Sequence, residues 1–146
     1  MELCKAHGLE KGPAAARLTV TRGVGARGLA FPDAAYSQAN VIVTVSSTAS
    51  PPKEAQIILS TIQRAEGSFT ARHKTLCYLD NVMAYQEASE AGAFEAIMMN
   101  AKGRVAGGAR SNIFCINDDG AVLTPSLEEG ALGGIVRGRV ISQMNV

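Results

Sequence analysis

Two glycine-rich stretches are the first parts of this sequence whose residue types and spacing could do chemistry. Residues 23–28 read Gly-Val-Gly-Ala-Arg-Gly and match G-x-G-x-x-G, a pattern that binds a pyrophosphate where a helix begins. The residues that follow lack helical periodicity and include Pro32, so the helix that such a site needs is not expected. No acidic residue ends the next apolar run, where a ribose ligand belongs. We therefore interpret these glycines as a tight loop after a strand.

Gly133 and Gly134 precede a predicted helix and offer a different kind of anion site. Backbone amides at a helix N-terminus, left uncovered by glycine, can cradle a phosphate group. A glycine-rich helix start can equally be structural, and the residues alone leave both interpretations open.

Metal and disulfide chemistry are not expected. The three cysteines, Cys4, Cys77 and Cys115, are odd in number, and no two of them have C-x-x-C spacing. Cys4 and His7 are close in sequence, but His73 is the only other histidine. We expect no metal site and three reduced thiols, as is typical of a cytoplasmic protein.

Composition and charge exclude several classes of function. The chain has 146 residues, 47% of them apolar, and a net charge of +1, which argues against a nucleic-acid partner or a polybasic membrane surface. Its wholly apolar stretches are far shorter than the roughly 20 residues that cross a bilayer. The N-terminus lacks the basic and apolar regions of a signal peptide.

The elements that must position these residues form an α+β mixture. Apolar and β-branched runs predict strands at residues 17–22, 41–45, 56–62, 104–105, 111–117 and 121–123. A turn at Asp118-Asp119-Gly120 separates the last two strands. We expect an extended segment at 68–75 and helices near 3–9, at 78–91 and from Gly134. In the helix at 78–91, Leu79, Val82, Met83 and Ala91 share one face.

Five sequence blocks in order carry a resemblance to a known enzyme family. They are LTVTRG at 18–23, HKTLCYL at 73–79, EAI at 95–97, GARSNIF at 108–114, and LTP at 123–125 with LGGIVR at 132–137. With them the chain resembles the class IV pyridoxal-phosphate enzymes, which include D-amino-acid and branched-chain aminotransferases and aminodeoxychorismate lyase. The resemblance implies the larger, C-terminal cofactor-binding domain of fold type IV, in which short mixed strands form a barrel-like sheet with a few helices. Residues 1–146 would form that single domain, shortened at both ends and without the family's N-terminal domain.

The resemblance assigns the central role to Lys74. In the family the lysine of this block forms a Schiff base with the aldehyde of pyridoxal 5'-phosphate and then moves a proton at the substrate α-carbon. That chemistry needs a neutral amine, whereas an unperturbed lysine has a pKa of about 10.4, which burial or a nearby cation can lower. From composition alone, Lys74 could equally be a surface lysine that precedes a helix.

Further cofactor contacts are implied at two other blocks. Gly134 opens the turn in which Ile135 and Val136 would bind the cofactor phosphate, although Val136 lacks the hydroxyl of the threonine common in the family. Ser111 and Asn112 match the family pattern as well; as residues they could also be no more than a polar strand start.

One departure from the family concerns the electronics of the cofactor. The family places a glutamate against the pyridine nitrogen, where it strengthens the ring as an electron sink. This chain has Gly107 at that position and Ala109 where a hydroxyl residue is common. Asp118 and Asp119 are the nearest downstream acids, and they lie in the predicted turn.

The function implied is transfer of an amino group between an amino acid and a 2-oxo acid, in a protein that forms a homodimer. The first alternative is 4-amino-4-deoxychorismate lyase, which eliminates pyruvate to give 4-aminobenzoate and to which the Lys-Thr-Leu order at residues 74–76 leans slightly. The second is a remnant of the family that keeps the fold without catalysis.

Overall fold

The computed structural model describes residues 2–25, 27–30 and 38–144. They fall into two compact units, Met1–Pro52 and Lys53–Val146, and each is described by itself. Within the described ranges no helix has the length and apolar character needed to cross a membrane.

The first unit is a two-stranded antiparallel ribbon. It follows a short helix, α1 (Glu2–Ala6), and pairs β1 (Ala14–Thr21) with β2 (Asn40–Ser47) along their whole length. Both strands were predicted, and both begin earlier in the chain than the predicted bounds. Gly23, just after β1, has a φ of +88° and lies against the backbone of Gln38, which agrees with its interpretation as a loop glycine.

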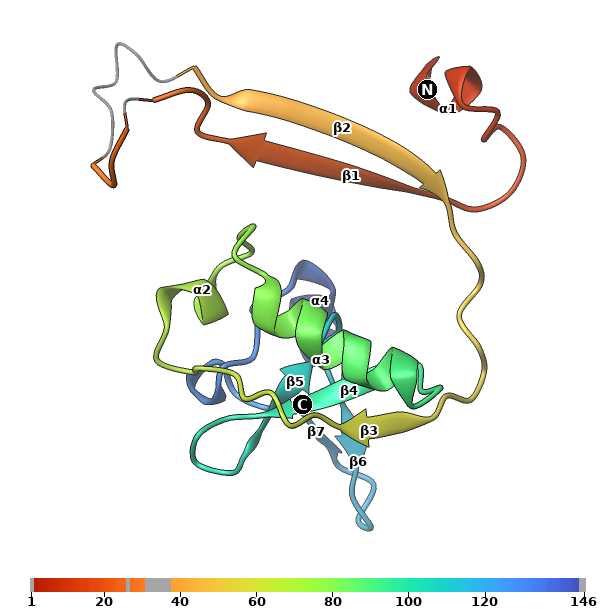
Figure 1. Cartoon of the computed structure of the whole chain (residues 1–146). Coiled ribbons are helices and arrows are strands. Elements are labelled where there is room, and N and C mark those ends of the chain that lie inside the picture. Colours follow the sequence, from red (N-terminus) through yellow and green to blue (C-terminus); the bar gives the residue numbers. More distant parts are fainter. Residues whose placement is uncertain (1, 26, 31–37, 145–146) are drawn as a thin grey trace. The chain divides into compact units, whose positions relative to one another are not determined.

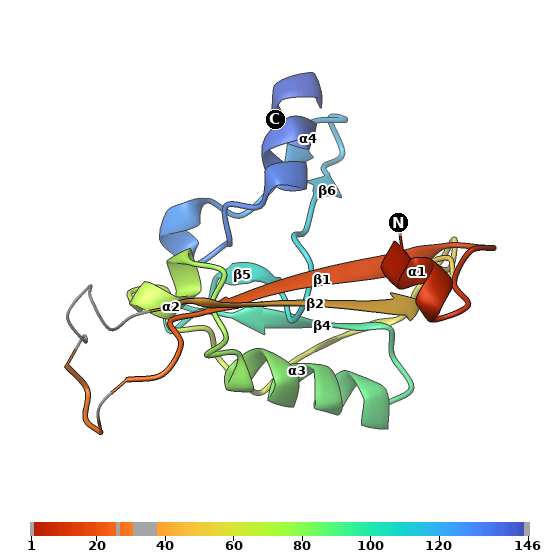
Figure 2. The ribbon, with the colours of Figure 1, turned by 90° about the horizontal axis from the view of Figure 1, so that it is seen from above.

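The second unit is built on a three-stranded sheet. Its strands are β3 (Ile57–Leu59), β4 (Glu95–Met99) and β5 (Val105–Gly108), in the order β3-β4-β5. The β3–β4 pair is parallel and the β4–β5 pair antiparallel. Helix α3 (Leu79–Glu90) lies along one face of this sheet, as Figures 1 and 2 show. The expectation of an α+β fold is confirmed.

Helix α3 packs through small residues rather than through its large apolar ones. Ala84 and Ala88 are fully buried against the sheet, in a core that includes Ala96 and Met98 of β4. Alanine lets the helix approach the strand closely, and that contact selects the buried face. The periodic apolar residues that the sequence placed together are exposed instead, namely Leu79, Val82, Met83 and Ala91.

A short helix replaces the extended segment that was expected before Lys74. Helix α2 (Phe69–Arg72) begins at Ser68, whose side chain accepts a hydrogen bond from the backbone N–H of Thr70. His73 ends it, with its ring stacked on that of Phe69 and its Nδ1 2.9 Å from the carbonyl oxygen of Phe69. The prediction of an extended chain was wrong because these local caps stabilise one helical turn.

The rest of the second unit is a hairpin and a helix. Strands β6 (Cys115–Ile116) and β7 (Val122–Leu123) pair across the predicted turn, where Gly120 has a φ of +80°. A 3-10 turn, η2 (Leu127–Glu129), follows, and the last element is α4 (Ile135–Met144). The predicted strand at 111–117 is regular only at its end.

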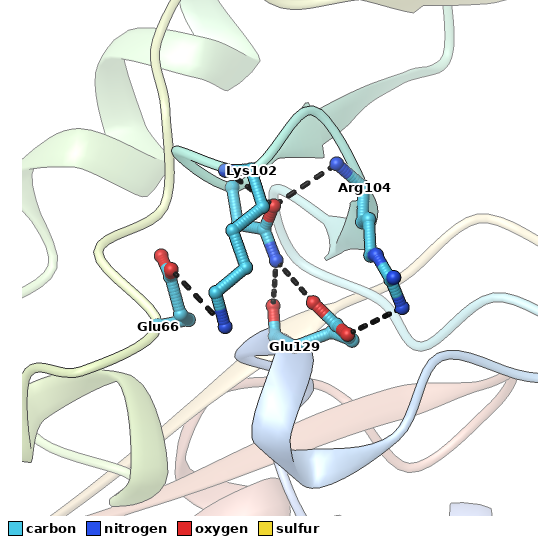
Figure 3. A network of polar contacts seen from close by, with 5 residues as sticks. Glu66, Lys102, Arg104 and Glu129 are labelled. Atoms are coloured by element: carbon cyan, nitrogen blue, oxygen red, sulfur yellow. Dashed lines mark hydrogen bonds and ion pairs between the residues drawn. The ribbon is translucent and has the colours of Figure 1, made fainter.

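A buried asparagine joins the β4–β5 turn to η2. The side chain of Asn100 is fully buried; its amide nitrogen donates to Glu129, and its oxygen accepts from the backbone N–H groups of Lys102 and Arg104. Figure 3 shows Glu129 also paired with Arg104, and Lys102 with Glu66. This network fixes the segment that leads from η2 to Gly133 and Gly134.

Glu87 links α3 to the chain that follows β3. Its carboxylate accepts hydrogen bonds from Ser60 Oγ at 2.5 Å, from the backbone N–H of Thr61 at 2.9 Å, and from the Thr61 hydroxyl. The Ser60 and Thr61 hydrogen bonds favour the ionised form and so lower the pKa of Glu87.

Replacing Glu87 with Gln should lower the melting temperature at neutral pH, with an effect that shrinks in acid. A carboxyl group whose pKa is lowered by folding adds stability above its unfolded pKa of about 4.3, and that stability is lost as the pH falls through the folded pKa. Melting curves between about pH 3 and pH 7 test this. Glu90→Gln, which alters a carboxylate bonded to Gln86 within α3, is the control. An effect of Glu87→Gln that is equal at every pH would contradict the prediction.

Candidate active site

Lys74 lies in the short connection between α2 and α3. The backbone of His73 is extended, with φ −124° and ψ 145°, and this directs the chain away from α2. The Lys74 side chain is exposed, and its Nζ lies 5.6 Å from the centre of the Tyr78 ring. Beside it the Thr75 hydroxyl is buried without a hydrogen-bond partner among the described residues. The lysine is thus accessible at the edge of a partly buried polar region.

A small pocket gathers Lys74 with residues from three other segments. Its cavity volume is about 50 Å³, and its walls include Arg64, Lys74, Tyr78, Gly107, Ser111 and Asn112. Arg64 follows β3, where it pairs with Asn100 as an isolated bridge, and Gly107 belongs to β5. Of the residues singled out in the sequence, the structure brings Lys74, Ser111 and Asn112 together here.

Arg64 and Tyr78 are pocket residues that sequence reasoning did not single out. Tyr78 donates from its hydroxyl to the carbonyl oxygen of Ala109 at 3.0 Å. Burial raises the pKa of Tyr78; the negative charge of Glu95 adds to the increase, and the positive charge of Arg64 opposes it. Tyr78 therefore keeps its proton at neutral pH. The sequence signal for Tyr78 was its place in the HKTLCYL block, whereas Arg64 lies in none of the five blocks.

Among the described residues, Arg64 keeps one side-chain donor without a partner. Its Nη2 donates to the carbonyl oxygen of Ala71 at 3.3 Å, but its Nε is buried without a hydrogen-bond partner in the described structure. Burial lowers the pKa of this guanidinium. A buried donor left unpaired is costly, so the site favours a bound acceptor such as an anionic oxygen.

Asn112 connects the pocket to the glycine turn before α4. Its side-chain nitrogen donates to the carbonyl oxygen of Leu132 at 2.9 Å, and a Cβ on Gly134 would lie 2.9 Å from its oxygen. Only glycine at 134 therefore leaves Asn112 undisturbed. Ile135 and Val136 open α4, where the first backbone amides lack partners within the helix. These two residues do not line the pocket; they lie next in the chain to Gly134, which contacts Asn112.

The pocket is cationic at its walls. Arg64, Lys74 and Arg110 line it, and none of the described lining residues is a carboxylate. Gly107, where the family resemblance places a glutamate, faces the pocket with no side chain; a Cβ there would make only an ordinary contact, 3.6 Å from the Ser111 carbonyl oxygen. Across the described residues there is also no cluster of three metal-ligating side chains.

Comparisons with known proteins identify the family. The model of the amino-transferase class IV family matches residues 1–146. Aminodeoxychorismate lyase from Bacillus subtilis (strain 168) is 31% identical over 144 residues, which cover 96% of this chain and 47% of that protein. The branched-chain aminotransferase of Thermoproteus uzoniensis, solved with norvaline, is 30% identical, with a TM-score of 0.78 over 90% of this chain and 44% of its own.

A third relative was solved with a cofactor derivative. It is the T.th. branched-chain amino acid aminotransferase complexed with N-(5'-phosphopyridoxyl)-L-glutamate, 25% identical, with a TM-score of 0.74 over 99% of this chain and 46% of its own. The chain belongs to the class IV aminotransferase family and has its fold, as the five sequence blocks indicated. It spans about half the length of the relatives that it matches.

The residues present fit pyridoxal phosphate in three respects. The accessible amine of Lys74 suits its aldehyde, and the buried unpaired Nε of Arg64 suits an anionic oxygen. Glycine at position 134 lets the Asn112 side chain approach the start of α4, because a Cβ there would lie 2.9 Å from the Asn112 oxygen. The absence of a carboxylate at Gly107 departs from the family pattern.

Gly108→Ala should destabilise the fold by roughly 1–3 kcal/mol, the range typical of overpacking in a well-packed site. A Cβ there would lie 2.5 Å from Ser111 Oγ and 3.1 Å from the carboxyl group of Glu95. Gly133→Ala is the matched control, because its Cβ would meet only Leu127 methyl groups at 3.7 Å and 3.9 Å. Chemical unfolding measures both, and equal stabilities for the two variants would contradict the close packing at Gly108.

Proposed function

We propose that this chain carries the cofactor-binding part of a pyridoxal-phosphate enzyme that transfers an amino group between an amino acid and a 2-oxo acid. The observation that supports this most directly is the convergence of Lys74, Arg64, Ser111 and Asn112 on one pocket. Membership of the class IV family adds weight to it.

Each side chain of the pocket has a separate task in this proposal. When bound, the cofactor supplies an aldehyde for attachment and a ring that accepts electrons from the substrate α-carbon. Lys74 Nζ would hold the cofactor through its aldehyde and would carry a proton to and from the substrate α-carbon. Asn112 and the first amides of α4, at Ile135 and Val136, hold the phosphate. Arg64 neutralises negative charge in the pocket.

Tyr78 orients the lysine segment rather than exchanging protons. Its raised pKa keeps the phenol protonated, and that proton is donated to the carbonyl oxygen of Ala109. The centre of the ring also lies 5.6 Å from Lys74 Nζ. Tyr78 thereby restricts where the lysine amine can lie.

Aminodeoxychorismate lyase activity is the second candidate. It is supported by the match to the Bacillus subtilis lyase over 96% of the chain and by the Lys-Thr-Leu order that starts at Lys74. Both reactions use the same lysine, so the pocket itself supports either. The choice between them depends on substrate contacts.

Reduction with borohydride in the presence of pyridoxal phosphate should label Lys74 selectively. The reason is that Lys74 is the lysine that lines the pocket, beside groups that bind an anion. Peptide mass mapping locates the phosphopyridoxyl group. Lys74→Ala should lose that label and retain its melting temperature, whereas Lys102→Ala, which removes a lysine paired with Glu66, should keep the label. Labelling scattered over surface lysines would favour the non-catalytic remnant.

Product analysis separates the two reactions. With an amino acid and a 2-oxo acid, an aminotransferase forms the exchanged pair and consumes both; with aminodeoxychorismate, a lyase releases pyruvate and 4-aminobenzoate. We expect exchange of the amino group, abolished by Lys74→Ala because the same amine moves the proton. Release of 4-aminobenzoate without exchange would replace the first proposal with the second, and a reaction that continues unchanged in Lys74→Ala would contradict both.

A further inference from the structure

A buried carboxylate lies directly behind the pocket wall that contains Gly107. Glu95, the first residue of β4, is only 5% exposed. Its Oε2 accepts a hydrogen bond from Ser111 Oγ at 2.7 Å, and its Oε1 accepts one from the backbone N–H of Ala96 at 3.0 Å. Gly108 permits this position, because a Cβ there would lie 3.1 Å from the carboxyl group.

Arg110 only partly neutralises this carboxylate. Its Nε lies 3.7 Å from Glu95 Oε2, while its Nη2 donates to the carbonyl oxygen of Phe94 at 2.7 Å. Its guanidinium is also held over the rings of Tyr85 and Phe94, at 4.4 Å and 4.6 Å from their centres. Because the Arg110 guanidinium also interacts with Phe94 and Tyr85, it does not fully neutralise Glu95. The Glu95 carboxylate can therefore also polarise Ser111.

Ser111 links the Glu95 carboxylate to the pocket, because it lines the pocket and donates a hydrogen bond to Glu95. A hydroxyl has one hydrogen to donate and two lone pairs to accept with, and the hydrogen of Ser111 is used by Glu95. Its oxygen is therefore left as an acceptor, polarised by the carboxylate behind it. Of the charged groups that face the pocket, Arg64, Lys74 and Arg110 are cations, so a protonated ring nitrogen needs such an acceptor.

We propose that the Glu95–Ser111 pair takes the place of the carboxylate that is missing at Gly107, with Ser111 accepting a hydrogen bond from the protonated ring nitrogen of pyridoxal phosphate. The assignment rests on the proposed function, since it concerns the same pocket and cofactor. Glu95 acts through Ser111 and is a positioning residue. In this proposal Glu95 of β4 supplies the negative charge that a glutamate at position 107 would otherwise supply.

The protonation state of the ring nitrogen tests the assignment directly. The chain is loaded with pyridoxal phosphate labelled with ¹⁵N in the ring, and the ¹⁵N resonance reports whether that nitrogen carries a proton. We expect a protonated ring in the unmodified chain at neutral pH. Glu95→Gln and Ser111→Ala should each reduce the ratio of protonated to unprotonated ring at least about tenfold, which corresponds to one pKa unit. Glu90→Gln, on α3, should leave the ratio unchanged.

A conservative variant and the borohydride label separate the possible failures. Ser111→Thr keeps the hydroxyl and should keep the ring protonated. If Glu95→Gln does not fold, the comparison of Ser111→Thr with Ser111→Ala still tests whether the hydroxyl is needed for a protonated ring. An unprotonated ring in the unmodified chain, or an unchanged ratio in both Glu95→Gln and Ser111→Ala while Lys74 is still labelled, would overturn this assignment alone. Loss of the Lys74 label from the unmodified chain would instead overturn the proposed function.

Discussion

The candidate site depends on one shared hydrogen-bond acceptor, the carbonyl oxygen of Ala109. It receives the Tyr78 hydroxyl at 3.0 Å and the side-chain amide of Asn81 at 2.5 Å, both from the start of α3. The N–H of Ala109 donates to the carbonyl oxygen of Ala96 on β4 at 2.9 Å, so the backbone of a single residue joins α3, β4 and the end of β5. Because Lys74 lies just before α3, this junction sets the lysine opposite the loop that follows β5.

The packing of small residues brings those segments close enough to meet. Ala84 and Ala88 lie on the buried face of α3, against Ala96 and Met98 of β4, and all four are almost inaccessible to solvent. Larger side chains at these positions would hold the helix farther from the strand and separate Tyr78 from its acceptor. The cost of this arrangement is that the large apolar residues of α3 remain exposed within the described structure.

The charges of the site follow from the same geometry. The pocket collects cations from three segments, which suits an anionic cofactor, and the Glu95 carboxylate is hydrogen-bonded to Ser111, one of the lining residues. Gly108 is what allows that carboxylate to approach, and the neighbouring Gly107 adds no side chain to the wall. A family member can thus lose a side chain at one position while a charge from a paired strand stays within reach of the pocket.

The sequence by itself determined the family, because five ordered blocks, which include Lys74 and the glycine turn at Gly134, can be recognised without coordinates. It also located most strands and the 118–120 turn, since β-branched runs and turn residues act over a few neighbours. Only the tertiary structure decided which face of α3 is buried and that Glu95 accepts a hydrogen bond from Ser111, 16 residues away in the sequence. Those outcomes depend on strand pairing and on how closely surfaces fit, and neither is encoded in local residue patterns.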